Sequence, residues 1–174
     1  MYRHFFKVVL LSFFFVGCAV KVPVPKEAHI QTLAQDLHHL DKQNTYAEAL
    51  ALSQDIFAQT STLSKKFKLT SPPQYHNLLV NIGVKEKGLC YHWSDALYGH
   101  LNAKHYKGFA FHLLGANIGK YWTEHNVLVV VAKGQSWKEG IILDPWRDSG
   151  TLYFSKVKED RKYDWKHRSQ RGCF

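Results

Sequence analysis

Three residues of this chain, Cys90, His125 and Asp144, have side chains that could together perform acyl transfer. A cysteine nucleophile needs a neighbouring imidazole that takes its proton and later returns it to the leaving amine. The imidazole in turn needs a carboxylate that fixes its tautomer. The three residue types therefore define one candidate mechanism, provided that the fold brings them together.

Cys90 is predicted to lie at a helix start or within one turn of it. It follows Gly88, and apolar residues then recur at four-residue steps as far as Leu101. The N–H groups and the positive dipole end of a helix start favour a thiolate and lower the pKa of a thiol. Taken alone, Cys90 is better explained as a small buried apolar residue or as a disulfide partner of Cys173.

His125 and Asp144 are predicted to lie on two neighbouring strands. His125 shares a strand face with valines at alternate positions as far as Val131, and residues 141–144 form a second short apolar segment beyond a turn. If the two strands pair as a hairpin, Asp144 near the end of one lies close to His125 near the start of the other. Asp148 competes for the same role, but it follows Asp144 in an expected loop.

The other elements predict an α+β fold, in which N-terminal helices precede a Cys-bearing helix packed on a small antiparallel sheet. Apolar spacing and capping residues indicate helices over 27–41, from Thr45 to about 63, and from about 70 to Gly83. Further strands are expected over 108–114 and 151–154, followed by a charged tail over 156–174.

The segments 88–97, 124–130 and 142–146 resemble the transglutaminase-like branch of the papain-like cysteine peptidase and acyltransferase superfamily. That branch has Cys at a helix start, His opening a strand and Asp on the next strand, often as Asp-Pro. The resemblance covers about residues 72–154. It implies a papain-like core and a catalytic triad of Cys90, His125 and Asp144.

The oxyanion donors of such a site are not defined by the resemblance. The Gln that papain-like enzymes place a few residues before their Cys has no counterpart in 82–89. The backbone N–H groups of Cys90 and Tyr91 are candidates because they lie at the helix start, and the side chain of Gln74 or Tyr75 is another candidate.

Other functional groups were weighed for substrate, metal and nucleic-acid binding. Trp146 and Arg147, with Trp93 next to the cysteine, are candidates for lining a substrate cleft. The centre of the chain is rich in His but lacks the His-x-x-x-His spacing of a helical zinc site, so no metal or cofactor is predicted. The net charge of +9 comes without a basic run or a recognition motif, so no nucleic-acid partner is predicted.

The first 17 residues have the layout of a secretory signal, with a positive start and an apolar run too short to span a bilayer comfortably. The sequence Phe15-Val16-Gly17-Cys18 resembles the lipobox of bacterial lipoproteins, with Phe15 where Leu is usual. The resemblance implies lipidation of Cys18 and a membrane-anchored protein of the bacterial cell envelope. Residues 18–26, with two prolines, then form a tether, and 27–174 form a single domain.

Two functional hypotheses follow from the sequence. The first is an exported, membrane-anchored acyl-transfer enzyme that acts on peptide, protein or peptidoglycan amides, as a peptidase or amidase if water accepts the acyl group and as a transglutaminase if an amine does. Peptidoglycan is favoured by location alone. The alternative is a non-catalytic envelope lipoprotein that uses the same fold as a binding or assembly module. The sequence leaves the oligomeric state and the role of Cys173 open.

Overall fold

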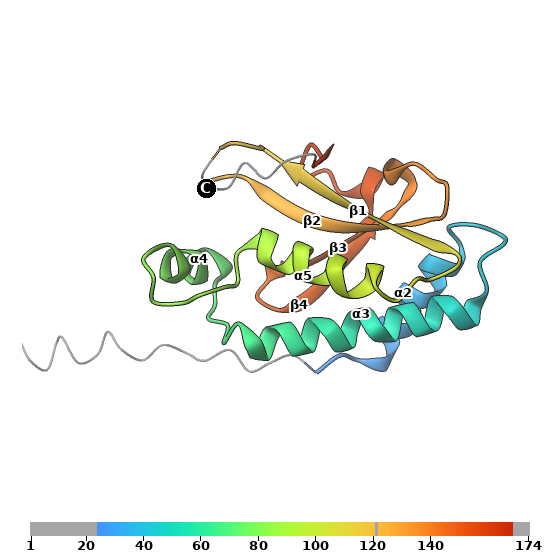
Figure 1. The fold of residues 1–174 in the computed structure, drawn as a ribbon, viewed down its shortest axis with the longest axis horizontal. Coiled ribbons are helices and arrows are strands. Elements are labelled where there is room, and N and C mark those ends of the chain that lie inside the picture. Colours follow the sequence, from blue (N-terminus) through green and yellow to red (C-terminus); the bar gives the residue numbers. More distant parts are fainter. Residues whose placement is uncertain (1–23, 121, 169–174) are drawn as a thin grey trace, which may run out of the picture.

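The computed structural model describes residues 24–120 and 122–168. Within them, four α-helices and a five-stranded antiparallel sheet form an α+β fold, which confirms the predicted class (Figure 1). The elements are α2 (Glu27–His38), α3 (Tyr46–Lys66), α4 (Pro73–Asn81), α5 (Cys90–Asn102), β1 (Phe109–Ala116), β2 (His125–Ala132), β3 (Ile141–Asp148), β4 (Thr151–Lys156) and β5 (Lys166–His167).

Strand β2 lies in the middle of the sheet, whose strand order is β4-β3-β2-β1-β5. All eight of its residues are buried, because α5 packs on one face of the sheet and a second apolar cluster covers the other. Leu128 and Val130 belong to the first cluster, and Val127 and Val129 to the second. The run of β-branched residues that predicted this strand thus suits a strand buried on both sides.

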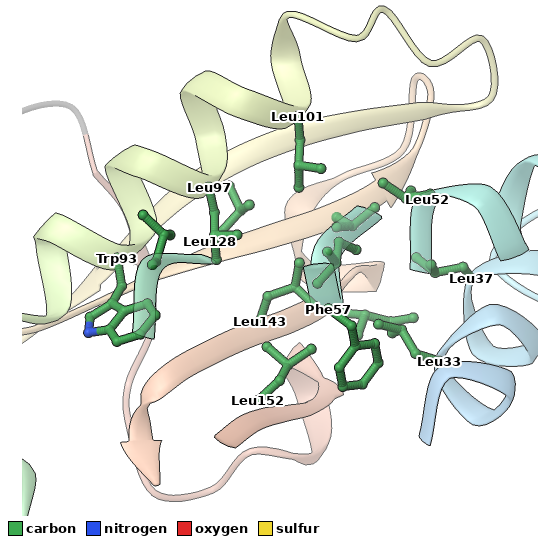
Figure 2. Close-up of a cluster of buried hydrophobic side chains, with 14 of the residues drawn as sticks. Leu33, Leu37, Leu52, Phe57, Trp93, Leu97, Leu101, Leu128, Leu143 and Leu152 are labelled. Carbon is green, nitrogen blue, oxygen red and sulfur yellow. The ribbon is translucent and has the colours of Figure 1, made fainter. Parts of the chain in front are cut away.

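The larger core cluster lies between the helices and the sheet (Figure 2). Helix α5 contributes Trp93, Leu97 and Leu101, which pack with residues of the sheet such as Leu128 and Leu143. This packing fixes the long axis of α5 along the sheet. The first residue of the helix is thereby held near the start of β2, where a functional site could form.

The N-terminal helices follow the predicted pattern with one difference. The Thr45 hydroxyl accepts a hydrogen bond from the Glu48 N–H at 3.3 Å and so caps α3 as expected. Helix α4 begins at Pro73 with Pro72 as its N-cap, which is later than the predicted start at about residue 70. No helix among the described residues is long and apolar enough to cross a bilayer.

The segment after β4 is a structured part of the fold, and the prediction of a charged tail there was wrong. A short 3₁₀ helix (Val157–Glu159) follows β4, and β5 then pairs with β1, with Leu114 opposite His167. Trp165 is buried in the second apolar cluster together with Val157. The apolar surface of these residues outweighs the charged composition of the segment.

Gly88 provides a test of how the chain enters α5. Its φ is +129°, and an added Cβ would meet Nε2 of His76 at 2.0 Å, so Gly88→Ala should lower the free energy of unfolding by at least about 2 kcal/mol. The matched control is Gly99→Ala within α5, where nothing lies within 4 Å of the new Cβ; it should stabilise the protein by about 0.5–1 kcal/mol. Urea unfolding measures both effects. Equal effects would contradict the positive φ of Gly88 and its close approach to His76.

Candidate active site

Cys90 is the first residue of α5, as predicted. The residues before it are held by side-chain contacts, because Nδ1 of His92 accepts hydrogen bonds from the N–H groups of both Gly88 and Leu89, each at 3.2 Å. The ring of His76 also contacts the Lys87 carbonyl oxygen, with Nε2 at 3.0 Å. The thiol therefore projects from a rigid helix start.

The hairpin of β2 and β3 brings His125 and Asp144 together. Leu128–Val130 pair with Ile141–Leu143, and the register of β3 against β4 shifts after Asp144. Nε2 of His125 lies 2.7 Å from Oδ2 of Asp144, and the two side chains are 2% and 1% exposed. The predicted contact between this imidazole and this carboxylate is confirmed.

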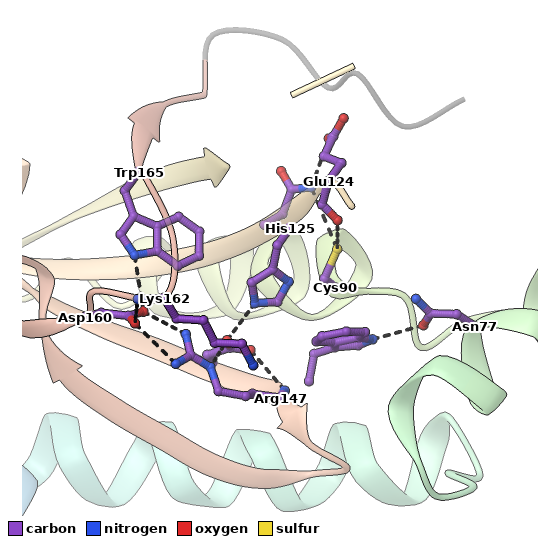
Figure 3. A network of polar contacts seen from close by, with 11 residues as sticks. Asn77, Cys90, Glu124, His125, Arg147, Asp160, Lys162 and Trp165 are labelled. Carbon is purple, nitrogen blue, oxygen red and sulfur yellow. Dashed lines mark hydrogen bonds and ion pairs between the residues drawn. The ribbon is translucent and has the colours of Figure 1, made fainter. Parts of the chain in front are cut away.

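The second ring nitrogen of His125 faces the cysteine side of the site. With Nε2 bound to Asp144, Nδ1 is buried and has no hydrogen-bond partner among the described residues. Sγ of Cys90 lies 3.9 Å from the carbonyl oxygen of Glu124, immediately before His125. Figure 3 shows the imidazole between the side chains of Cys90 and Arg147. The order thiol, imidazole and carboxylate is the one that acyl transfer through a cysteine requires.

Electrostatics favour a charged imidazole at this position. Burial alone would lower the pKa of His125, but the charge and hydrogen bond of Asp144, with a smaller contribution from Cys90, raise it to about 9. Burial likewise opposes ionisation of Asp144, yet His125 and Arg147 hold the pKa of Asp144 below its usual value. At neutral pH the pair is therefore an imidazolium and a carboxylate.

Arg147 binds the carboxylate of Asp144 and does not line a cleft. Its Nε lies 2.9 Å from Oδ2 of Asp144, its backbone N–H donates to Oδ1 at 3.1 Å, and its Nη2 lies 2.7 Å from Oδ2 of Asp160. The guanidinium also lies over the ring of Tyr153, 3.9 Å from its centroid. The side chain is only 10% exposed, so its role here is to hold Asp144 in place.

The two tryptophans proposed for the cleft differ in their positions. Trp93 is 1% exposed, and its Nε1 donates to the Gly88 carbonyl oxygen at 3.2 Å, so it belongs to the core and not to a cleft wall. Trp146 is half-buried, with its ring centroid 4.8 Å from that of His125 and its Nε1 donating to Oδ1 of Asn77 in α4 at 2.9 Å. Only Trp146 remains a candidate for contact with a substrate.

The C-terminal segment covers the imidazole, which the sequence analysis did not predict. The ring centroids of Tyr163 and Trp165 lie 4.7 Å and 5.6 Å from that of His125. Asp160 joins this segment to the site, because it accepts a hydrogen bond from Trp165 Nε1 at 3.2 Å as well as pairing with Arg147. Aromatic residues that interrupt a charged stretch were the sequence signal for this packing.

The remaining candidates lie at the margin of the site. Gln74 is exposed on α4, while Tyr91 is the second residue of α5. Asp148 is exposed at the end of β3, away from His125. Cys18 and Cys173 lie outside the described residues.

No three His, Cys, Asp or Glu side chains in residues 24–120 and 122–168 are arranged to hold a metal ion. The chain gave no match when it was compared with protein-family models, with curated proteins and with solved structures.

The charge state of His125 can be tested by following its ring protons in NMR spectra as the pH changes. We expect a pKa of about 9 in the wild type. In Asp144→Asn the pKa should fall to its ordinary value of about 6.5 or below, because burial then outweighs the smaller contribution from Cys90. The pKa of His112, which burial lowers, is the internal reference and should not change.

The same pKa sets the direction of a stability change. Because the pKa of His125 is higher in the folded protein than in the unfolded chain, its stabilising contribution is complete below about pH 6.5 and is lost as the pH rises through about 9. Urea unfolding should show this loss in the wild type but not in Asp144→Asn, in which the pKa of His125 is no longer raised. If the free energy of unfolding depended on pH in the same way in both proteins, Asp144 would not be the group that raises the pKa of His125.

Proposed function

We propose that this protein is a thiol-dependent acyl-transfer enzyme with Cys90 as the nucleophile. The observation that carries the proposal is the buried His125–Asp144 pair, in which Asp144 occupies one ring nitrogen and the other nitrogen is directed to a cysteine at a helix start. A structural ion pair does not require a thiol next to the second ring nitrogen, whereas a catalytic histidine does.

In the proposed reaction, the Cys90 thiolate attacks the carbonyl carbon of an amide, and the electron pair of the C=O bond moves to oxygen. The tetrahedral intermediate collapses as Nδ1 of His125 gives its proton to the departing amine, which leaves an acyl-thioester. Water or a second amine then loses a proton to His125 and releases the acyl group. Asp144 stabilises the imidazolium throughout.

The packing around His125 supports this chemistry. Trp146, Tyr163 and Trp165 surround the imidazole, so water has little access to its bond with Asp144. In such an environment a charge–charge interaction is stronger than in water. Arg147 in turn keeps Asp144 ionised and oriented, because it donates to both oxygens of the carboxylate.

The proposed substrates are amides of peptides, proteins or peptidoglycan stem peptides. Their amide carbonyl is an electrophile suited to a cysteine with an imidazole partner. Trp146, which joins the site to α4, offers an apolar surface to the substrate. Hydrolysis makes the protein a peptidase or amidase, and transfer to an amine makes it a transglutaminase.

One observation favours a binding or assembly module without turnover as the second candidate. Cys90 is only 5% exposed, and the recess of about 790 Å³ lined by Asp41, Glu48 and Lys107 includes none of the three site residues. An enzyme with this site must open enough for a carbonyl group to reach Sγ. The reactivity of the thiol therefore separates the two candidates.

Alkylation of Cys90 by iodoacetamide tests the proposal. In the full chain purified in detergent, mass spectrometry of the Cys90 peptide should show rapid labelling well below pH 8. In His125→Ala the rate at pH 7 should fall roughly 10- to 30-fold, because an ordinary thiol with a pKa near 8.5 is only a few per cent ionised there. Asp144→Asn should give an intermediate rate, and Cys90→Ser is the blank. A rate and pH profile of an ordinary thiol, indifferent to both substitutions, would refute the catalytic proposal.

We also propose that the protein is anchored in the bacterial cell envelope by a lipid on Cys18, a residue outside the described part of the chain. The lipobox-like sequence that ends at Cys18 supports this proposal. Cys18→Ala should abolish incorporation of a labelled fatty acid and move the protein out of the detergent phase in a phase-partition assay. Undiminished labelling of the variant would show that the anchor is elsewhere.

A further inference from the structure

Asn126, the residue after His125, places an amide directly against the thiol. Its side chain is 1% exposed, and its Nδ2 lies 3.8 Å from Sγ of Cys90 and 3.0 Å from Oε1 of Glu124. His125 and Asn126 lie on opposite faces of β2, so the strand directs the imidazole towards Asp144 and the amide towards α5. Cys90 is in contact with Asn126 because it begins α5.

Two charged neighbours fix which end of the amide faces the thiol. Oδ1 of Asn126 accepts a hydrogen bond from Nη1 of Arg168 at 3.1 Å, while Nδ2 donates to the Glu124 carboxylate. The opposite orientation would set oxygen against carboxylate and N–H against guanidinium. The N–H groups of Asn126 are therefore the part of the amide presented to Sγ.

Arg168 is itself buried and held by two further contacts. Its Nη2 forms an ion pair with Asp95 of α5, its backbone N–H donates to the Leu113 carbonyl oxygen of β1 at 2.9 Å, and its side chain is 5% exposed. A contact between α5 and the end of the C-terminal segment thus holds the amide of Asn126. Because these contacts already fix its orientation, the amide needs little rearrangement when a negative charge forms beside it.

We propose that Asn126 is an oxyanion donor of this site and that Arg168 is its positioning residue; the inference rests on the acyl-transfer function proposed above. When the thiolate bonds to a carbonyl carbon, the oxygen that receives the C=O electron pair lies one bond from the carbon attached to Sγ. A donor that already contacts Sγ can reach that oxygen. Asn126 thereby supplies the function for which the sequence offered Gln74 or the N–H of Tyr91.

Two reactions of Cys90 separate this role from a general effect on the thiol. p-Nitrophenyl acetate acylates the thiolate through a tetrahedral oxyanion and releases p-nitrophenolate, while iodoacetamide alkylates the same thiolate by displacing iodide and forms no oxyanion. Stabilisation of the oxyanion affects only the first reaction. Stabilisation of the thiolate affects both reactions.

In the detergent-purified full chain at pH 7, we expect p-nitrophenyl acetate to acylate Cys90 of Asn126→Ala about 10²- to 10³-fold more slowly than Cys90 of the wild type. The rate of alkylation by iodoacetamide should stay within about twofold of the wild type. Asn126→Asp keeps an oxygen for Arg168 but sets a second oxygen against the Glu124 carboxylate in place of the N–H donor, so it should lose acylation to at least the same degree. Arg168→Lys keeps the charge opposite Asp95 but not the fork that holds the amide, and should acylate roughly 10- to 100-fold more slowly.

Asn44→Ala is the matched control, because it removes a similarly buried amide that binds the Leu37 carbonyl oxygen instead of the site. Both of its rates should equal those of the wild type. Acylation of Asn126→Asp at the wild-type rate, or equal losses in acylation and alkylation, would overturn the oxyanion assignment while leaving Cys90 as a nucleophile. A wild-type Cys90 that is neither acylated nor alkylated faster than an ordinary thiol would overturn the proposed function and this inference together.

Discussion

The buried contact between His125 and Asp144 is the interaction that the rest of the site depends on. Bringing two charges out of water costs several kcal/mol for each ion, and their mutual attraction offsets this only with additional hydrogen bonds. Arg147 supplies those bonds, and Asp160 balances the charge that Arg147 adds. The result is a chain of alternating charges, His125, Asp144, Arg147 and Asp160, that is neutral overall when the imidazole is protonated.

This chain of charges explains why the C-terminal segment is part of the site. Asp160 can pair with Arg147 only because the 3₁₀ helix after β4 turns the chain back over the sheet. The same turn places Tyr163 and Trp165 on the imidazole and leads to Arg168, which holds Asn126. One segment therefore determines the environment of the His125–Asp144 pair on one face of β2 and the position of the Asn126 amide on the other.

Local patterns in the sequence predicted the elements and the candidate triad, because helix starts, strand alternation and hairpin turns depend on nearby residues. Cys90 at the start of α5 and the contact of His125 with Asp144 follow from such patterns. The roles of Arg147 and Asn126 did not, since each depends on a partner that only the tertiary fold supplies. Arg147 was expected in a cleft because an Arg is usually exposed, and it is buried here because both Asp144 and Asp160 pair with its guanidinium.

The burial of the site also limits which molecules can reach the Cys90 thiol. Every contact that keeps water from the imidazole narrows the approach to a thiol that is 5% exposed. The inner faces are fixed by the core behind Trp93 and by the charge pairs of Arg147. The side of Trp146 and α4 is held more weakly, by the hydrogen bond from Trp146 to Asn77 and by the contact of His76 with the Lys87 carbonyl oxygen. A bond of this kind contributes about 1 kcal/mol net, far less than the buried pairs. The side of Trp146 and α4 is therefore where the proposed reaction would need the site to open. Because the ring centroid of Trp146 lies 4.8 Å from that of His125, this opening would also change the packing on the imidazole.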